Sequence, residues 1–414
     1  MPSLRRLAVL FAVCAGPLGA QTVVLHEDFS AGVPPAGWSE SHGWAGGWTE
    51  DPTAPGAAFH DDVRGLADSW LVTPPLDLRG LREVWLHADQ TVDFADWRLL
   101  HAVEVSTDQG ATWTRVLADT SPDGGSVLRA DLSAWAGRSG VLVAFHYEGN
   151  YASEWRLDNV QVSDLPLRVL RTALREETGS LYALLDPSGW RKAAAVAEAV
   201  GGRLVTVEDA AENTWLLDTF GGVDGSPRHL WIGLSDAKAE GEYRWLDGTA
   251  PAWTNWAPGQ PDDSPLSSPD GEDYVRMYGR HAWQGEGRWA DEADAPALGE
   301  LPLAWGVVEY DGPVLQAGPL RAGAFVSFEL HNLGPGHWTV IAWSNSGRGP
   351  TPSRAGNLLL SDPILTFPSV QADARGEAAL AIWFGPEARG LPFWFHALDL
   401  EAGRLSNPLF GVAE

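Results

Sequence analysis

Nine side chains with oxygen donors are concentrated between residues 236 and 291, in a stretch with little regular pattern. They are Asp236, Glu240, Gln260, Asp262, Asp263, Asp270, Glu272, Asp273 and Asp291. The set contains no histidine, which argues against zinc, and calcium takes about six to eight oxygen ligands, often from loops. Because carboxylates held close together repel one another unless a cation lies between them, the cluster predicts a calcium site. The contiguous EF-hand pattern is absent, so several loops must assemble it.

Two helical patterns and several strand-like runs surround this stretch. Residues 190–200 form an alanine-rich helical pattern that Gly201-Gly202 ends. A second helix is predicted over 209–220, because Asp209 and Glu212 have the spacing of a capping box. Apolar runs at 231–234 and 305–310 read as strands. A long irregular segment inside a compact domain is usually functional, which favours a binding site built on loops.

Short motifs follow one another through this region in a recognisable order. They are Trp231-Ile232-Gly233-Leu234, Trp253-Thr254-Asn255-Trp256, Pro258-Gly259-Gln260-Pro261-Asp262-Asp263, Gly271-Glu272-Asp273 and Gly287-Arg288-Trp289-Ala290-Asp291. Together with Trp190 and the helices, they resemble the C-type lectin-like domain from about residue 178 to 311. The resemblance implies an α+β fold that binds sugar through calcium.

The resemblance also implies a role for each acidic residue. The family's main calcium would be bound by Gln260, Asp262, Glu272 and Asp291, which would also hold two neighbouring sugar hydroxyls. Pro261 would be cis, and the Gln-Pro-Asp order is similar to the galactose-preferring type. A second family calcium site would be formed by Asp236, Glu240, Asp263 and Asp273. Trp283 is the expected stacking residue for the sugar ring, with Trp256 as the alternative.

Three departures from the family pattern bear on sugar binding. The family's Trp-Asn-Asp reads Trp289-Ala290-Asp291, so Ala290 removes one calcium ligand and one sugar contact. Residues 264–270 lengthen the loop between two ligand groups, and the galactose type often has Trp where Asp263 stands. Because the second group is intact, we expect calcium binding to be the firmer property and sugar binding the more sensitive one.

The flanking segments predict a mainly β, multidomain chain. Residues 21–164 contain short strands and turns, and phrases such as Leu71-Val72-Thr73-Pro74-Pro75 and Trp155-Arg156-Leu157-Asp158-Asn159. These resemble the jelly-roll modules of the MAM, cleaved-adhesin and choice-of-anchor group of secreted bacterial proteins. The resemblance implies a jelly roll whose first and last strands are neighbours. Residues 165–177 read as a linker or short connecting helix, and 312–414 as a β-sandwich of unknown role.

The first twenty residues predict export. Arg5 and Arg6 precede an apolar run, and a small-residue site ends at Ala20. This is the pattern of a secretory signal peptide cleaved before Gln21, which indicates a secreted or cell-surface protein. The only cysteine, Cys14, lies in this peptide, and Val13 before it argues against a lipidation site. No later segment has the roughly 18 apolar residues of a membrane span, so membrane insertion is not expected.

Charge and motifs narrow the function classes. With 28 basic and 55 acidic residues, the net charge is −27, which disfavours nucleic acid as a partner. The 22 tryptophans favour aromatic cores and sugar-stacking faces. The expected ligand is therefore a glycan or cell-surface polysaccharide, bound with Ca²⁺. A lectin-like scaffold for protein–protein adhesion is the second hypothesis. Since no catalytic motif is evident, a polysaccharide-acting enzyme is only a minor third one.

Overall fold

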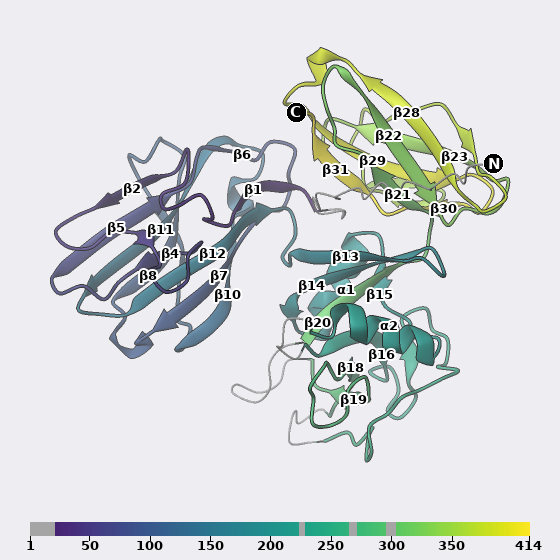
Figure 1. Ribbon diagram of the computed structural model, residues 1–414, viewed down its shortest axis with the longest axis horizontal. Coiled ribbons are helices and arrows are strands. Elements are labelled where there is room, and N and C mark those ends of the chain that lie inside the picture. The colour runs from purple at the N-terminus through teal and green to yellow at the C-terminus, as the bar shows by residue number, and fades with distance from the viewer. Residues whose placement is uncertain (1–20, 223–227, 265–270, 295–303) are drawn as a thin grey trace, which may run out of the picture.

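The computed structural model describes residues 21–222, 228–264, 271–294 and 304–414. The expected signal peptide, Asp270 and most of the 264–270 insertion lie outside the described residues. Strands account for 44% of the chain and helices for 8%, which confirms that the protein is mainly β. Figure 1 shows several separate sheets along the chain. No described helix is long and apolar enough to cross a membrane.

Two antiparallel sheets form the N-terminal region. The first has the order β10-β7-β12-β4-β3 with β1 beside β12, and the second β2-β5-β11-β8-β9 with β6 beside β11. Their bounds are β1 (Val23–Glu27), β2 (Ser39–His42), β3 (Thr49–Glu50), β4 (Ala58–His60), β5 (Leu66–Val72), β6 (Leu76–Asp77), β7 (Trp85–Asp93), β8 (Leu100–Ser106), β9 (Thr114–Ala118), β10 (Gly124–Asp131), β11 (Ser139–Asn150) and β12 (Glu154–Ser163), with 3₁₀ turns η1 (Ala95–Trp97) and η2 (Ser133–Trp135). The first strand pairs with the last, Glu27 opposite Val160, as expected.

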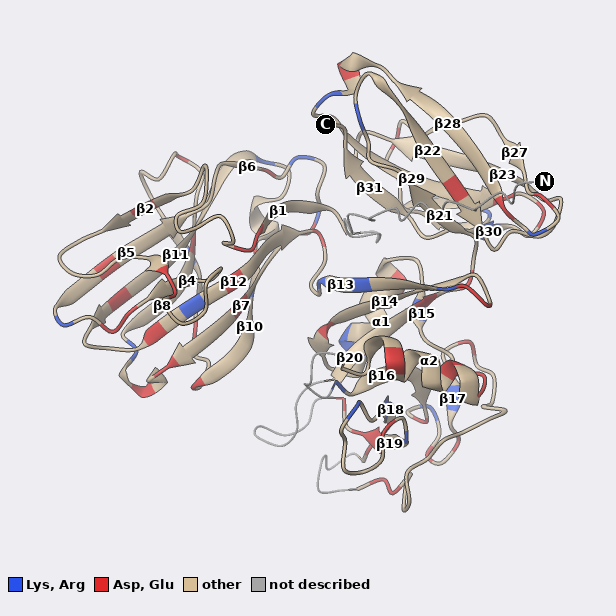
Figure 2. Cartoon of the chain, viewed as in Figure 1, with Lys and Arg blue, Asp and Glu red and all other residues tan. Residues whose placement is uncertain are grey.

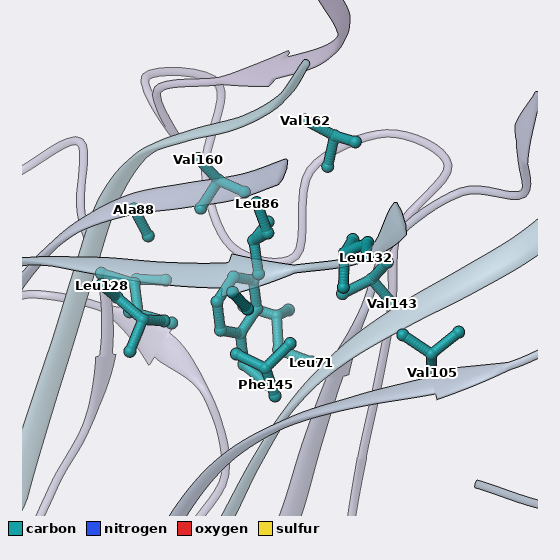
Figure 3. Packing of buried hydrophobic residues seen from close by; sticks show 14 of the residues in the cluster. Leu71, Leu86, Ala88, Val105, Leu128, Leu132, Val143, Phe145, Val160 and Val162 are labelled. Atoms are coloured by element: carbon teal, nitrogen blue, oxygen red, sulfur yellow. The ribbon is translucent and has the colours of Figure 1, made fainter. Parts of the chain in front are cut away.

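The two N-terminal sheets share one hydrophobic core (Figure 3). Leu86 and Val162 extend from the first sheet, and Leu71 and Phe145 from the second, all fully buried. Because side chains alternate between the two faces of a strand, the residues directly before and after each of these four lie on the outer face of their sheet. Burying each large apolar side chain contributes about 1.5–3 kcal/mol, so this core can hold the region together without disulfides.

The middle region is one mixed sheet with two helices. Its order is β13-β14-β20-β16-β18-β19, with β15 beside β20 and β17 beside β16, and among the described strands only β16 and β20 run parallel. The bounds are β13 (Val169–Arg175), β14 (Ser180–Ser188), α1 (Trp190–Ala199), β15 (Arg203–Leu204), α2 (Ala210–Phe220), β16 (Leu230–Ser235), β17 (Arg244–Trp245), β18 (Tyr274–Met277), β19 (Trp289–Glu292) and β20 (Ala304–Tyr310). This sheet and these helices position the candidate site.

The segment 165–177 is neither a simple linker nor a helix, which corrects the sequence prediction. It contains β13, paired with β14 so that Ala173 lies opposite Tyr182. The run Val169-Leu170-Arg171-Thr172-Ala173 has no clear period, so local pattern alone cannot distinguish a helix from an edge strand. The neighbouring strand β14 decides the conformation, because it supplies the hydrogen-bonding partners.

Both predicted helices form close to their expected bounds. Helix α1 buries Trp190, whose indole Nε1 donates to the carbonyl of Ile232 at 2.7 Å. At the start of α2 the Asp209 carboxylate accepts from the Glu212 N–H at 2.8 Å, which confirms the predicted cap. The Glu212 carboxylate accepts from the Glu208 N–H at 2.8 Å, so the reciprocal half of the capping box is shifted by one residue.

The C-terminal region contains two larger sheets and a small hairpin. Their orders are β21-β22-β28, then β26-β23-β29-β30 with β27 beside β23 and β31 beside β29, and the hairpin β24-β25. The bounds are β21 (Val314–Ala317), β22 (Ala324–His331), β23 (Trp338–Ser344), β24 (Thr351–Ser353), β25 (Gly356–Leu358), β26 (Leu365–Thr366), β27 (Val370–Gln371), β28 (Ala378–Phe384), η3 (Pro386–Ala388), β29 (Pro392–Asp399), β30 (Arg404–Leu405) and β31 (Leu409–Val412). Phe328, Phe384 and Phe395 meet in its core.

Candidate calcium and sugar site

Three strand ends of the middle sheet converge where the acidic residues lie. Asp236 directly follows β16, Glu272 and Asp273 directly precede β18, and Asp291 is within β19. Ser235 is opposite Tyr274, and Val275 is opposite Asp291. Strand pairing thus brings together acidic residues that are up to 55 positions apart in the sequence. Figure 2 shows acidic segments around β18 and β19.

A compact carboxylate set lies at this end of the sheet. One oxygen from each of Asp262, Glu272 and Asp291 falls within 4.8 Å of the others. Glu272 and Asp291 are buried, whereas Asp262 is exposed. Three negative charges at this separation repel strongly in a partly dehydrated site, and a divalent cation between them removes that repulsion. The donor set is made of oxygen atoms, as a calcium ion requires.

Gln260 is held against the same set by two hydrogen bonds. Its Oε1 accepts from the Asp291 backbone N–H at 3.1 Å, and its Nε2 donates to Asp262 Oδ1 at 2.6 Å. The Gln260–Pro261 peptide bond is cis, as expected. The structure therefore brings together all four residues that the sequence assigned to the main site.

Backbone N–H groups fix the ligand loop over the Asp291 carboxylate. Oδ1 accepts from the Asp262 N–H at 3.1 Å, and Oδ2 accepts from the Asp263 N–H at 2.9 Å. The Glu272 carboxylate accepts from the Ser264 N–H at 3.0 Å. Each carboxylate oxygen has two lone-pair sites, so Asp291 Oδ1, with one hydrogen bond, keeps acceptor capacity for a cation.

Sequence reasoning did not assign Tyr243 to the site. Its hydroxyl donates to Asp291 Oδ2 at 3.1 Å. Burial and the charges of Asp291 and Asp236 raise the pKa of Tyr243, so the phenol stays protonated and keeps donating. Tyr243 therefore lies between the two acidic groups. No local pattern could identify it, because its contact with Asp291 spans 48 positions.

A buried ion pair next to the site was also missed. Arg276 Nη2 lies 2.7 Å from Glu292 Oε2, and both side chains are almost fully buried. Burial raises the pKa of Glu292, and the positive charge of Arg276 opposes that shift. The pair follows from register, since Arg276 and Glu292 lie on adjacent strands β18 and β19. An arginine and a glutamate 16 positions apart in the sequence do not by themselves predict an ion pair.

The second predicted group is more loosely arranged. Among the described residues, Asp236, Glu240, Asp263 and Asp273 do not form a set with ligand atoms within 4.8 Å. They do interact electrostatically, because Asp236, Asp263 and Asp273 all raise the pKa of Glu240. Burial, followed by the charge of Asp273, raises the pKa of Asp236. Of the two predicted groups, the set of Asp262, Glu272 and Asp291 is therefore the more compact in this structure, and the expectation that the second group binds calcium more firmly stays a prediction.

One atom of the second group nevertheless points to a cation. Asp236 is 1% exposed, and its Oδ1 is buried without a hydrogen-bond partner. Its Oδ2 accepts from the Gly241 N–H at 2.9 Å. A buried acceptor without a partner costs about 1–3 kcal/mol, and a cation beside Oδ1 would remove that cost. The second group therefore fits calcium through Asp236.

The structure does not bring Trp283 to the carboxylate set. The β18–β19 hairpin extends from the Val275–Asp291 pair past Tyr278, and Trp283 lies in its tip. Three residues of strand span about 10 Å, so Trp283 is at least that far along the hairpin. The tip lies beside the end of α2, where the Arg280 N–H donates to the Gly221 carbonyl. Trp283 therefore lies in the hairpin tip, away from the strand ends that carry the carboxylates, and its role in stacking on the sugar stays a prediction.

The alternative stacking residue, Trp256, lies nearer the site. Its ring packs edge-on against Tyr243 at 5.0 Å and Trp289 at 6.0 Å, and it is partly exposed. Because Tyr243 donates to Asp291, Trp256 is one side chain removed from the carboxylates. Most of its surface nevertheless packs against the core.

Ala290 packs in a small apolar cluster. It is 1% exposed and contacts Ala257 and Tyr278. Asparagine at this position would bury an amide, which costs about 1–3 kcal/mol without a partner. We expect Ala290→Asn to lower the thermal midpoint of the middle region in chelator. A midpoint that is unchanged or raised would show that position 290 faces the ion instead.

Comparison with known proteins finds similarity to C-type lectin domains in this region. A family model for the lectin C-type domain matches residues 186–294. A perlucin-like protein from Mytilus galloprovincialis is 36% identical over 83 residues, covering 19% of this chain and 51% of the relative. An alpha-N-acetylgalactosamine-specific lectin from Patiria pectinifera is 39% identical over 98 residues, covering 23% and 54%. The chain spans about half the length of these two relatives.

One solved structure is also similar to part of this chain in sequence. The mouse scavenger receptor C-type lectin carbohydrate-recognition domain is 26% identical, covers 31% of this chain and 88% of its own, and has a TM-score of 0.26. The assignment rests on the family model and the two sequence relatives. Together they support a C-type lectin domain at residues 186–294.

Proposed function

We propose that this protein is a secreted, calcium-dependent glycan-binding protein. The observation that carries the proposal is the carboxylate set of Asp262, Glu272 and Asp291, with ligand atoms within 4.8 Å of one another and with Gln260 hydrogen-bonded to two of its members. Calcium bound there would leave coordination positions for two sugar hydroxyls. The proposal includes no catalytic step.

The proposed sugar class is galactose-like. Gln260 and Asp262 have the order that the sequence resemblance associates with galactose, and one relative is named as specific for alpha-N-acetylgalactosamine. The test is a glycan array probed with the full chain in calcium and then in chelator. Binding to terminal galactose or N-acetylgalactosamine that disappears in chelator is expected. Binding that survives chelation, or that is confined to mannose, would contradict the galactose assignment.

A protein-binding scaffold is the second candidate, favoured by Ala290. This residue supplies no ligand atom and packs against Ala257 and Tyr278, so the sugar would lose one contact that the family provides. This candidate would be favoured if the chain bound no glycan on the array and a protein partner bound the same loops. The array distinguishes the two because a scaffold needs no terminal sugar.

We further propose that calcium also binds beside Asp236. A ligand that binds only the folded state stabilises it by about 2.7 kcal/mol at a concentration of 100 Kd. Calcium should therefore raise the melting temperature of the full chain by several degrees. Combined Asp236→Asn and Asp273→Asn replacements should reduce the shift, whereas Asp247→Asn, on an exposed turn, should not. A melting temperature that is insensitive to calcium would exclude both ion sites.

The remaining features of the proposal rest on sequence patterns. We propose cleavage before Gln21, export to the cell exterior or surface, and a bacterial origin. We also propose a jelly roll for the two N-terminal sheets and a β-sandwich for the C-terminal region. The adjacency of β1 and β12 supports the jelly roll.

A further inference from the structure

The outer face of the first N-terminal sheet is covered around His87 on β7. Leu86 and Ala88, on either side of His87, belong to the N-terminal core, so His87 lies on the opposite, outer face of the sheet. Its neighbours across the sheet are Arg129 on β10 and Gln161 on β12. A histidine on an outer face usually meets water, but His87 is 0% exposed. Another part of the chain must therefore lie over this face.

The middle region provides the cover. Arg129 Nη2 donates to the Pro187 carbonyl on β14 at 2.9 Å. Lys192 of α1 lies over the Trp85 ring of β7, with Nζ 5.5 Å from the ring centre. These two contacts place β14 and α1 over the outer face of β7 and β10. The interface is polar, with cationic side chains contributed by both regions.

Arg168 connects the two regions through buried hydrogen bonds. On the side of the middle region, its Nε and Nη2 donate to the two carboxylate oxygens of Asp186, each at 3.0 Å. On the N-terminal side, Nη2 donates to Asp89 on β7, and Nη1 donates to the Asn159 carbonyl on β12 at 3.1 Å. Arg168 is 5% exposed and Asp186 1%. Two-point pairing of a guanidinium with a carboxylate fixes direction as well as distance.

The segment that joins the two regions is short and buried. Strand β12 ends at Ser163 and β13 begins at Val169. Between them, Leu165 and Leu167 pack in the core of the middle region. Domains that move relative to one another are usually joined by exposed, flexible linkers. A free linker of five residues would let its ends vary over about 12 Å, and this buried segment lacks that freedom.

The covered face and the carboxylate set lie at opposite edges of the middle sheet. The sheet order places β13 and β14 at one edge and β18 and β19 at the other. Asp186 and Pro187 belong to β14, whereas Asp291 belongs to β19. Figure 1 shows β13 and β14 on the side of this sheet toward the other regions, with β18 and β19 on the far side. The contact between the regions therefore leaves the candidate site uncovered.

We propose that the N-terminal and middle regions form one rigid body, with Arg168 as the clasp between them. The β13–β14 edge is then the mount, and the β18–β19 edge presents its loops at a fixed orientation to the N-terminal sheets. A ligand that binds to such a body pays no entropic cost for ordering the two regions. The proposal depends on neither calcium nor sugar.

The test is the distance between two spin labels, one in each region of the full chain, measured by pulsed electron resonance in chelator. The labels are attached at Thr114→Cys and Thr214→Cys, both exposed positions. The chain also carries Cys14→Ser, because Cys14 is the only native cysteine. One distance is expected, with a spread less than half of the roughly 12 Å of a free five-residue linker.

A charge-neutral double variant tests the clasp. Asp89→Asn and Arg129→Gln together remove two contacts that cross between the regions, and they leave Arg168 and Asp186 paired. The spread of distances should at least double. Asp89→Asn alone, at a carboxylate whose side chain is 44% exposed, should widen the spread by a smaller amount. This single variant serves if circular dichroism shows that the double variant does not fold.

The matched control removes an ion pair of the middle region that makes no contact between regions. Glu242→Gln with Arg244→Gln also leaves the net charge unchanged, and both side chains are about half exposed or more. The control should keep the wild-type spread.

Two results would overturn the proposal. A wild-type spread of about 12 Å would show that the regions move freely. A spread that Asp89→Asn leaves unchanged, alone and together with Arg129→Gln, would show that Arg168 is not the clasp. Neither result bears on the calcium and sugar site, because the labelled chain is measured without calcium.

Discussion

Replacing Glu272 by Gln and Asp262 by Asn together is expected to abolish retention of the full chain on galactose resin in calcium. Both residues belong to the carboxylate set whose ligand atoms lie within 4.8 Å of one another. The substitutions keep the shape of the side chains but remove two of the three negative charges that would bind the ion. Mutating a residue that only hydrogen-bonds to a metal ligand lowers metal affinity by about 10–100-fold. Losing two ligands themselves should therefore lower the affinity for calcium by more than about 100-fold.

Glu242→Gln is the matched control for this prediction. Glu242 is on a neighbouring loop and its side chain is 68% exposed, but it is not a member of the carboxylate set. Its replacement changes the net charge without touching the proposed ligands. Equal loss of retention in the control and in the double variant would indicate a general electrostatic effect, and the assignment of the site would then be wrong.

Acid is expected to destabilise the N-terminal region between pH 6.5 and pH 4. His60 is fully buried and stacks on Tyr147 at 3.6 Å. Burial lowers its pKa from 6.5 to about 4, and burial lowers that of His101 to about 2. Below pH 6.5 the unfolded chain binds protons that these folded side chains do not bind. Stability therefore falls as the pH falls, by about 3 kcal/mol for His60 alone.

Calorimetric scans between pH 7.5 and pH 4 measure this loss. His60→Gln should lower stability at pH 7.5 but flatten its dependence on pH, because one proton-linked group is gone. Two results would contradict the burial argument. One is that the stability of His60→Gln depends on pH as strongly as that of the wild type. The other is that His60 titrates by NMR near its ordinary pKa of 6.5.

The local sequence pattern was sufficient to predict those helices and strands whose conformation is determined by their own residues. Asp209 can cap α2 in any context because its carboxylate bonds within the first turn. The apolar runs around Leu71 and Phe145 predict strands, and both residues are fully buried in strands. Gln260, Asp262 and Glu272 were found because they stand in short motifs with characteristic spacing.

Features set by strand pairing could not be predicted in the same way. The segment 169–175 is a strand because β14 lies beside it. Trp283 is remote from the carboxylates because the β18–β19 hairpin extends away from them. Tyr243 reaches Asp291 only in the folded chain. The contact between Tyr243 and Asp291 joins residues 48 positions apart, and a single sequence carries no signal for it.

Isothermal titration calorimetry tests the central claim most directly. The full chain would be titrated with calcium, and the calcium-loaded protein then with galactose and, separately, with mannose. We predict calcium binding, heat of binding for galactose only after calcium is present, and no galactose heat in the Glu272→Gln and Asp262→Asn double variant. Galactose heat that is the same in chelator and in calcium, or no calcium binding at all, would contradict a calcium-dependent lectin.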